Sequence, residues 1–374
     1  MDEDAVRDRL RSVEDPDLGD DIVSLGLVTD ITVEGDEVFI DLALGAPYSP
    51  NETGIAGKVR EVLAEDGIEP ELSATVPDRD DVPEGEGVLP KVKNVIAVAS
   101  GKGGVGKSTV SVNLAAGLSR LGARVGLLDA DIYGPNVPRM FDADEPPMAT
   151  AQETLIPPEK HGVKLMSMAF LVGEDDPVIW RGPMVHKVLT QLTADVEWGE
   201  LDYLVVDLPP GTGDTQLTML QTMPVTGAVI VTTPQDVALD DALKGLQMFA
   251  RHDTVVLGIA ENMSTFVCPD CGGEHDIFSS GGGEAFAEQH DMPFLGAVPL
   301  DPRVREGGDR GQPLVLDEES ETGDAFRSLA AAVANNVGIV HRNTVAQSNR
   351  GRVPTELPEE PEESSGRPDE LPEN

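Results

Sequence analysis

Short apolar runs alternate with helical patterns through most of the chain. Between Lys91 and about Val345 the expected strands are apolar on both faces, at Val95–Ala99, Val125–Leu128, Leu204–Val206, Ala228–Thr232 and Val255–Ile259. Strands of this kind are typical of a parallel sheet whose two faces are both covered by helices. Residues 91–345 are therefore expected to form an α/β domain with a mostly parallel sheet sandwiched by helices.

A smaller α/β domain is expected over residues 1–77, ahead of the large one. Helical patterns alternate there with β-branched and aliphatic runs. The expected helices are Asp4–Val13 and Asn51–Ala64, and the expected strands are Ile22–Val33, Glu37–Leu44 and Leu72–Val76.

Two further segments are too acidic and too rich in proline to bury much surface. Residues 78–90 are expected to be a linker, and residues 346–374 a disordered tail. A solubilising tail is a simpler interpretation of the second segment than a binding tail.

The charge of the chain restricts its partners. There are 68 acidic residues against 27 basic ones, and the formal net charge is −41. Phosphate backbones and anionic lipids would be repelled, so neither nucleic acid nor membrane is expected as a partner. Few lysines and acid spread along the chain favour a halophilic archaeal source, because molar salt screens such self-repulsion. The alternative is an ordinary acidic protein with an acidic tail.

A cytoplasmic location is expected. The start, Met1-Asp2-Glu3-Asp4, lacks the basic and apolar regions of a secretory signal, and no run of 18 apolar residues is present. The two cysteines, Cys268 and Cys271, do not form a disulfide framework, and their spacing suits a reducing compartment.

The strongest motif is a phosphate-binding loop, G-x-x-x-x-G-K-[ST], between an expected strand and an expected helix. Glycines let backbone N–H groups converge on a phosphate, and the helix N-terminus adds a positive dipole end. Lys107 would neutralise phosphate charge, and Ser108 would offer its hydroxyl to Mg²⁺. The residues expected to bind ATP here are Gly101, Lys102, Gly103, Gly104, Val105, Gly106, Lys107, Ser108 and Thr109.

Acidic residues follow two of the other expected strands. Asp129 and Asp131 come after Val125–Leu128, and Asp207 comes after Leu204–Val206. Acids at the carboxyl ends of parallel strands face the ligand crevice. Both segments are therefore expected at the nucleotide site.

Cys268 and Cys271 form a C-x-x-C pair. Two thiolates at this spacing can bind an iron–sulfur or a zinc centre, but they supply only half of a tetrahedral set. A two-fold symmetric dimer would bring four sulfurs together. A redox dithiol and two inert thiols remain alternatives, and His275 is more simply a solvated loop histidine than a ligand.

The second lysine of the loop, Lys102, resembles the deviant phosphate loop of the MinD, ParA and nitrogenase iron-protein class. This resemblance implies a P-loop NTPase in which Lys102 reaches into the partner subunit's nucleotide site. It also implies roles for four residues outside the loop. Asp131 orients the attacking water, Asp207 holds Mg²⁺ through water, the Gly211 amide senses the γ-phosphate, and the Asn262 side chain contacts adenine.

The motifs together resemble the Mrp/ApbC family of iron–sulfur cluster carrier ATPases over about residues 90–345. The segments that carry the likeness are Gly101–Thr109, Asp129–Pro135, Asp207–Asp214, Glu261–Ser264 and Cys268–Cys271. The resemblance implies a homodimer in which Cys268 and Cys271 of both chains hold a [4Fe–4S] cluster. It also implies Mg-ATP-dependent transfer of that cluster to apo iron–sulfur client proteins, with Lys102, Lys107 and Asp131 as catalytic residues.

Residues 1–77 resemble the SufT-like domain that is often fused in front of such ATPases, through Asp15-Pro16 and Ile22–Val28. The family commonly has a reactive cysteine where this chain has Ser49. Because a serine hydroxyl is a poor iron ligand, this domain is expected to dock partners or clients and not to hold metal.

Two other functions stay open from the sequence. A spatial-organising ATPase like MinD or ParA would leave the C-x-x-C pair unexplained. A nucleotide-gated electron donor like the nitrogenase iron protein has its cluster cysteines far apart in sequence. Zinc in the same dimer site, with a structural role, is a third alternative.

The acidic composition predicts that the protein unfolds on dialysis from molar salt to low salt, because charge repulsion is then no longer screened. Circular dichroism across a salt series would measure this loss. Unchanged stability at low salt would identify an ordinary acidic protein instead.

Overall fold

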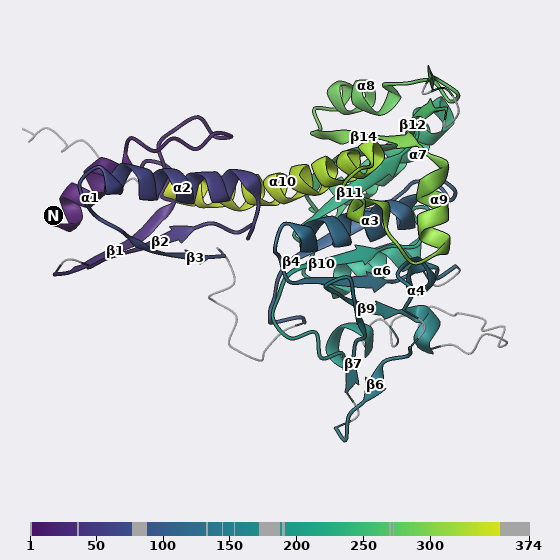
Figure 1. Ribbon diagram of the computed structural model, residues 1–374, viewed down its shortest axis with the longest axis horizontal. Coiled ribbons are helices and arrows are strands. Elements are labelled where there is room, and N and C mark those ends of the chain that lie inside the picture. The colour runs from purple at the N-terminus through teal and green to yellow at the C-terminus, as the bar shows by residue number, and fades with distance from the viewer. Residues whose placement is uncertain are drawn as a thin grey trace, which may run out of the picture.

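The computed structural model describes residues 2–35, 37–76, 88–131, 134–143, 145–152, 154–171, 188, 191–268, 271 and 273–351. Within these residues the larger domain is built on a nine-stranded sheet (Figure 1), with the strand order β13-β12-β11-β4-β10-β5-β9-β8 and β14 paired to β12. Its strands are β4 (Val92–Ala99), β5 (Val125–Asp129), β8 (Glu159–Lys160), β9 (Val163–Ser167), β10 (Leu201–Asp207), β11 (Gly227–Thr232), β12 (Val256–Val267), β13 (Glu274–His275) and β14 (Phe294–Leu300).

The central pairings of this sheet are parallel, and only its pairings with the short strands β8 and β13 are antiparallel. The larger domain's helices are α3 (Lys107–Arg120), α4 (Val137–Met140), α6 (Asp214–Thr222), α7 (Asp236–Arg251), α8 (Gly282–Gln289), α9 (Pro302–Asp309) and α10 (Glu321–Gly351), with a small hairpin of β6 (Met148–Ala149) and β7 (Leu155–Ile156).

Alternate residues of the central strands enter two different cores. Ile96 of β4 and Val205 of β10 pack with α3 and α10, while Val95 and Leu204 pack with α6, α7 and α8. This alternation follows from the two-residue period of a strand. The expected mostly parallel sheet with helices on both faces is therefore confirmed.

The N-terminal domain has a three-stranded sheet, β1-β2-β3, and two helices. Its elements are α1 (Glu3–Leu10), β1 (Val28–Glu34), β2 (Glu37–Ala43), α2 (Pro50–Ala64) and β3 (Glu71–Thr75). The prediction of a strand from Ile22 was wrong for its first part, because β1 begins at Val28. The Asp21 carboxylate accepts hydrogen bonds from the Val23 and Ser24 amides and folds this stretch into turns.

Helix α10 belongs to both domains, and Figure 1 shows it leaving the large sheet and lying beside α2. At its start, Thr322 Oγ1 donates to Asp301 Oδ2 at 2.8 Å. Near its end, Ala346 is buried in the apolar core of the N-terminal domain. Residues 346–351, which the sequence assigns to the tail, continue this helix. The rest of the expected tail, 352–374, and most of the expected linker, 77–87, lie outside the described residues.

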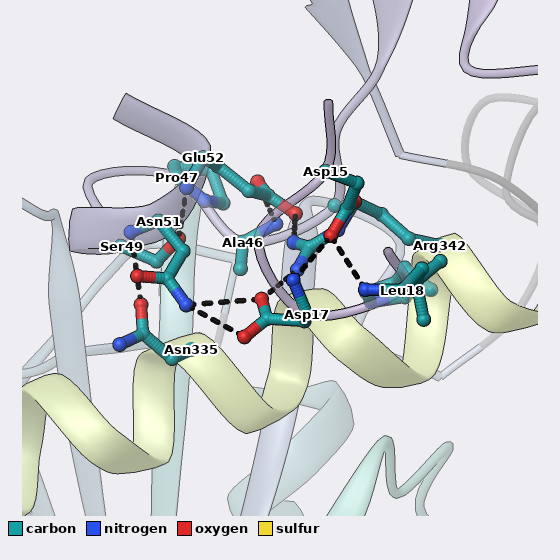
Figure 2. A network of polar contacts seen from close by, with 12 residues as sticks. Asp15, Asp17, Leu18, Ala46, Pro47, Ser49, Asn51, Glu52, Asn335 and Arg342 are labelled. Atoms are coloured by element: carbon teal, nitrogen blue, oxygen red, sulfur yellow. Dashed lines mark hydrogen bonds and ion pairs between the residues drawn. The ribbon is translucent and has the colours of Figure 1, made fainter. Parts of the chain in front are cut away.

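Arg342 of α10 is completely buried among three carboxylates of the N-terminal domain (Figure 2). Its Nε lies 2.7 Å from Asp15 Oδ2, its Nη1 lies 2.9 Å from Glu52 Oε1, and its Nη2 lies 2.5 Å from Asp17 Oδ2. Burial raises the pKa of the Glu52 carboxyl, since a charged carboxylate is poorly solvated there. The guanidinium is thus the positive charge that allows Asp15 and Glu52 to be buried between the domains.

No helix in the described part of the chain has both the length and the apolar composition that crossing a bilayer requires.

Arg342→Ala is expected to lower the free energy of unfolding by about 3–5 kcal/mol, because the buried carboxylates of Asp15 and Glu52 would lose their counter-charge. Urea denaturation would measure the loss. Arg350→Ala, which removes an exposed arginine from the same helix, is the matched control. Equal stability of the two variants would contradict this prediction.

Candidate nucleotide site and cysteine hairpin

The candidate nucleotide site lies at the carboxyl ends of three adjacent strands. In the sheet, Asp207 of β10 pairs with Val98 of β4 on one side and with Asp129 of β5 on the other. The glycine-rich loop follows β4 directly and leads into α3. Ligand crevices of open α/β sheets form at such strand ends.

The loop itself has the backbone that a phosphate cradle needs. Gly104 and Gly106 have φ values of 84° and 82°, which favour glycine. A Cβ atom built on Gly103 or Gly104 would meet nothing within 4 Å, so both face open space. On Gly106 it would lie 2.1 Å from Asn262 Nδ2. The backbone can therefore approach an anion closely, and the first turn of α3 has no side-chain cap competing for its N–H groups.

Lys107 is buried at the start of α3 and faces two carboxylates. Its Nζ lies 2.8 Å from Asp207 Oδ1 and 4.0 Å from Asp131 Oδ2. This lysine has the reach and the charge to neutralise a phosphate group at the loop. The residues present thus suit a nucleoside di- or triphosphate.

The carboxylate of Asp207 is completely buried and accepts hydrogen bonds from two hydroxyl groups of α3. Ser108 Oγ donates to its Oδ2 and Ser111 Oγ donates to its Oδ1, each at 2.6 Å. A hydroxyl and a carboxylate in contact are a donor set that Mg²⁺ accepts in NTPases. Ser111 was not identified from the sequence, although it lies one helical turn after Lys107, on the same face.

Asp129 lies beneath the segment that carries Asp131. It accepts hydrogen bonds from the Asp131 amide at 3.2 Å, from the Val137 amide at 3.2 Å and from Ser167 Oγ at 3.0 Å. Burial, together with the charge of Asp207, raises the pKa of the Asp129 carboxyl to about 7. The Asp129 side chain therefore supports the segment that carries Asp131.

A cavity of about 660 Å³ opens in front of the loop. Its far walls are α4 and α9, which contribute Arg139 and Arg305, and the end of β14, which contributes Pro299–Asp301. The two arginines were not identified from the sequence, because neither belongs to a recognisable motif. Each is paired with a carboxylate of α9, Arg139 with Asp309 at 3.3 Å and Arg305 with Glu306 at 3.8 Å.

The structure brings most of the predicted nucleotide residues to this cavity. Those that line it are Gly103, Gly104, Gly106, Lys107, Ser108, Thr109, Asp131 and Asn262. The others are not part of its lining: they are Gly101, Lys102, Val105, Asp207 and Gly211.

Gly211 and Asn262 each make a hydrogen bond that bears on their expected roles. The Gly211 amide donates to the Ser100 carbonyl at 2.9 Å, so a γ-phosphate would have to compete for it. Asn262 Nδ2 donates to the Val105 carbonyl at 2.9 Å, which ties the end of the loop to β12.

The cysteine pair lies at the tip of a hairpin that extends from the same strand. Strand β12 turns back into β13, with Phe266 opposite His275, and the Cys268 amide donates to the Gly273 carbonyl at 2.9 Å. Cys271 is exposed and Cys268 is partly exposed, and they are not joined in a disulfide. Both residues therefore lie at least partly on the surface of the subunit.

Within the described ranges, no group of three or more histidine, cysteine, aspartate or glutamate side chains could hold a metal ion. A tetrahedral centre takes four ligands, of which the two cysteines supply two, and a second copy of the chain could provide the others.

Comparisons with known proteins cover both domains. Residues 91–334 match the family described as NUBPL iron-transfer P-loop NTPase, and residues 3–71 match the iron–sulfur cluster assembly protein family. An iron–sulfur cluster carrier protein of Synechocystis is 45% identical over 346 residues, which span 90% of this chain and 98% of that protein. A carrier protein of Escherichia coli is 51% identical over 245 residues, or 65% of this chain and 66% of that protein.

Solved structures confirm the P-loop NTPase fold. A nucleotide-binding protein of Archaeoglobus fulgidus in complex with ADP superposes with a TM-score of 0.56 and 37% identity, over 64% of this chain and 93% of that one. The cell division ATPase MinD of Pyrococcus furiosus gives 0.50 and 23%, over 65% of this chain and 98% of that one, which shows the fold alone.

The raised pKa of Asp129 predicts a pH effect on the nucleotide-free protein. In the unfolded chain this carboxyl ionises near pH 3.8, but in the folded state it ionises near 7. Ionisation thus favours unfolding, and the contribution of Asp129 to stability falls as the pH rises from about 4 to about 7. The unfolding free energy of wild type minus that of Asp129→Asn should fall as the pH rises over this range, because asparagine does not ionise. A difference that stays constant with pH would contradict the prediction.

Proposed function

This chain belongs to the family of iron–sulfur cluster carrier P-loop NTPases, and we propose that it is an Mg-ATP-dependent carrier which binds a [4Fe–4S] cluster as cargo at a homodimer interface and transfers it to apo-proteins. The observation that carries the proposal is the course of strand β12. Asn262 of this strand lines the nucleotide cavity, and Cys268 follows directly after its end.

The connection between the two sites is short. Six positions separate Asn262 from Cys268, which corresponds to at most about 20 Å along an extended strand. The strand is irregular on the way, because Met263 has a φ of 57° and the register with β14 shifts between Asn262 and Phe266. A change at the nucleotide can therefore reach the cysteines through one covalent segment, provided that the nucleotide states differ in their affinity for the cluster.

The positions of the residues that line the cavity support the roles proposed here for them. Lys107 and the glycine amides hold the phosphates, and Asn262 lies at the cavity wall where a base can be recognised. Ser108 and Asp207 would hold Mg²⁺, which on binding neutralises phosphate charge. Asp131 is proposed to orient the attacking water, the Gly211 amide to sense the γ-phosphate after leaving Ser100, and Lys102 to act in the partner subunit's site.

The cluster is proposed to bind between two subunits, because each hairpin supplies two thiolates and a [4Fe–4S] cluster takes four. The exposure of Cys271 supports this arrangement. Zinc bound by the same four sulfurs is the alternative occupant. Anaerobic purification with metal analysis separates them, since a cluster gives about four iron atoms per dimer.

The N-terminal domain is proposed to dock clients without holding metal. Ser49 is completely buried, and its Oγ accepts the Glu52 amide at 3.3 Å, as the N-cap of α2. A capping hydroxyl in this position has a structural role and is not offered to a ligand.

A cytoplasmic location and adaptation to high salt also remain proposals. The carrier proteins of Synechocystis and Escherichia coli give no support to the halophilic archaeal origin. The dialysis experiment addresses the salt dependence directly.

The proposal predicts that the two sites can be separated by mutation. Cys268→Ala together with Cys271→Ala should abolish cluster binding after anaerobic reconstitution, because the thiolates are lost, and should leave ATP binding unchanged. Lys107→Ala should weaken ATP binding, because a phosphate-binding lysine is lost, and should leave cluster binding unchanged. Visible absorbance and nucleotide titration measure the two properties.

An unchanged cluster spectrum in the double cysteine variant would contradict the carrier proposal. A MinD-like or ParA-like positioning role would instead show as co-sedimentation with liposomes or DNA at native salt. An electron-donor role would show as nucleotide-dependent reduction of an acceptor without loss of the cluster.

A further inference from the structure

Ser111 makes a hydrogen bond to Asp207 in addition to the contact that would satisfy a buried helical serine. Its hydroxyl already lies 3.1 Å from the Lys107 carbonyl one turn back, which is a sufficient partner for such a group. It also lies 2.6 Å from Asp207 Oδ1. A hydrogen bond of this length to a carboxylate is charge-assisted, and such bonds are stronger than neutral ones.

Among the described residues, the side chains of Lys107, Ser108 and Ser111 contact the Asp207 carboxylate, and the first two are proposed to contact the nucleotide or its metal ion. Ser108 and Lys107 both line the cavity, where the first is proposed to contact Mg²⁺ and the second the phosphates. Ser111 is completely buried and is not part of the cavity lining. It is therefore the partner that can stay on Asp207 in every nucleotide state.

From this geometry we propose that Ser111 is a positioning residue for the magnesium site. Its hydroxyl holds Asp207 Oδ1, so that Oδ2 remains directed toward Ser108 and the metal. The inference rests on the Mg-ATP part of the proposed function and adds a residue to it. Groups that orient a metal-binding carboxylate typically change metal affinity by about 10–100-fold when they are removed.

The experiment is a titration of ADP onto the full-length protein, once with excess Mg²⁺ and once with EDTA. In the presence of Mg²⁺, Ser111→Ala is expected to bind ADP about tenfold more weakly than wild type. In EDTA, the two proteins are expected to bind ADP with equal affinity. Ser111→Cys retains the size of the side chain but has a weak S–H donor, so it should show the same loss. If filling the space were what matters, the cysteine would restore binding and the proposal would be wrong.

Ser119→Ala is the matched control, because Ser119 lies on the same helix and donates to the Gly162 carbonyl, away from Asp207. It should bind ADP as wild type does under both conditions. An equal loss for Ser111→Ala with and without Mg²⁺, or no loss at all, would overturn the role of Ser111 while leaving the proposed function intact. If wild type gained no affinity from Mg²⁺, the Mg-ATP part of the function would fall and the role of Ser111 with it.

Discussion

The contact between Lys107 and Asp207 is the constraint on which the nucleotide site depends. A chain with a net charge of −41 has to bind a polyanion, and it encloses one lysine against a buried carboxylate to do so. The lysine requires the acid as a counter-charge, and the acid in turn requires the hydroxyls of α3. Parallel pairing of β4, β10 and β5 places all of these groups at one edge of the sheet.

Much of this arrangement could be predicted from the sequence, because it depends on local patterns. Apolar runs identified the central strands, and the glycine spacing identified the loop together with Lys107 and Ser108. Ser111 and the two cavity arginines have no local pattern, since their roles depend on which strand or helix lies opposite. The turns at Ile22 were mistaken for strand because their aliphatic residues are buried in the domain core, and burial alone does not distinguish a turn from a strand.

The cysteine hairpin illustrates the same division between local and distant information. The C-x-x-C spacing predicted a metal site, but not that β12 would run from the nucleotide cavity to the first cysteine. This single strand makes the nucleotide cavity and the cysteine pair neighbours in the chain. A carrier that must release its cargo on a signal gains from such proximity, because few groups have to move for the signal to pass.

Helix α10 has a consequence for how the protein is made. The acids around Arg342 belong to the first 52 residues, and Arg342 itself lies 290 positions after Glu52. On the ribosome the N-terminal domain emerges long before its counter-charge and before Ala346, which completes its apolar core. The N-terminal domain is thus completed only after the P-loop domain has been synthesised, by the helix whose residues also pack in the core of the P-loop domain.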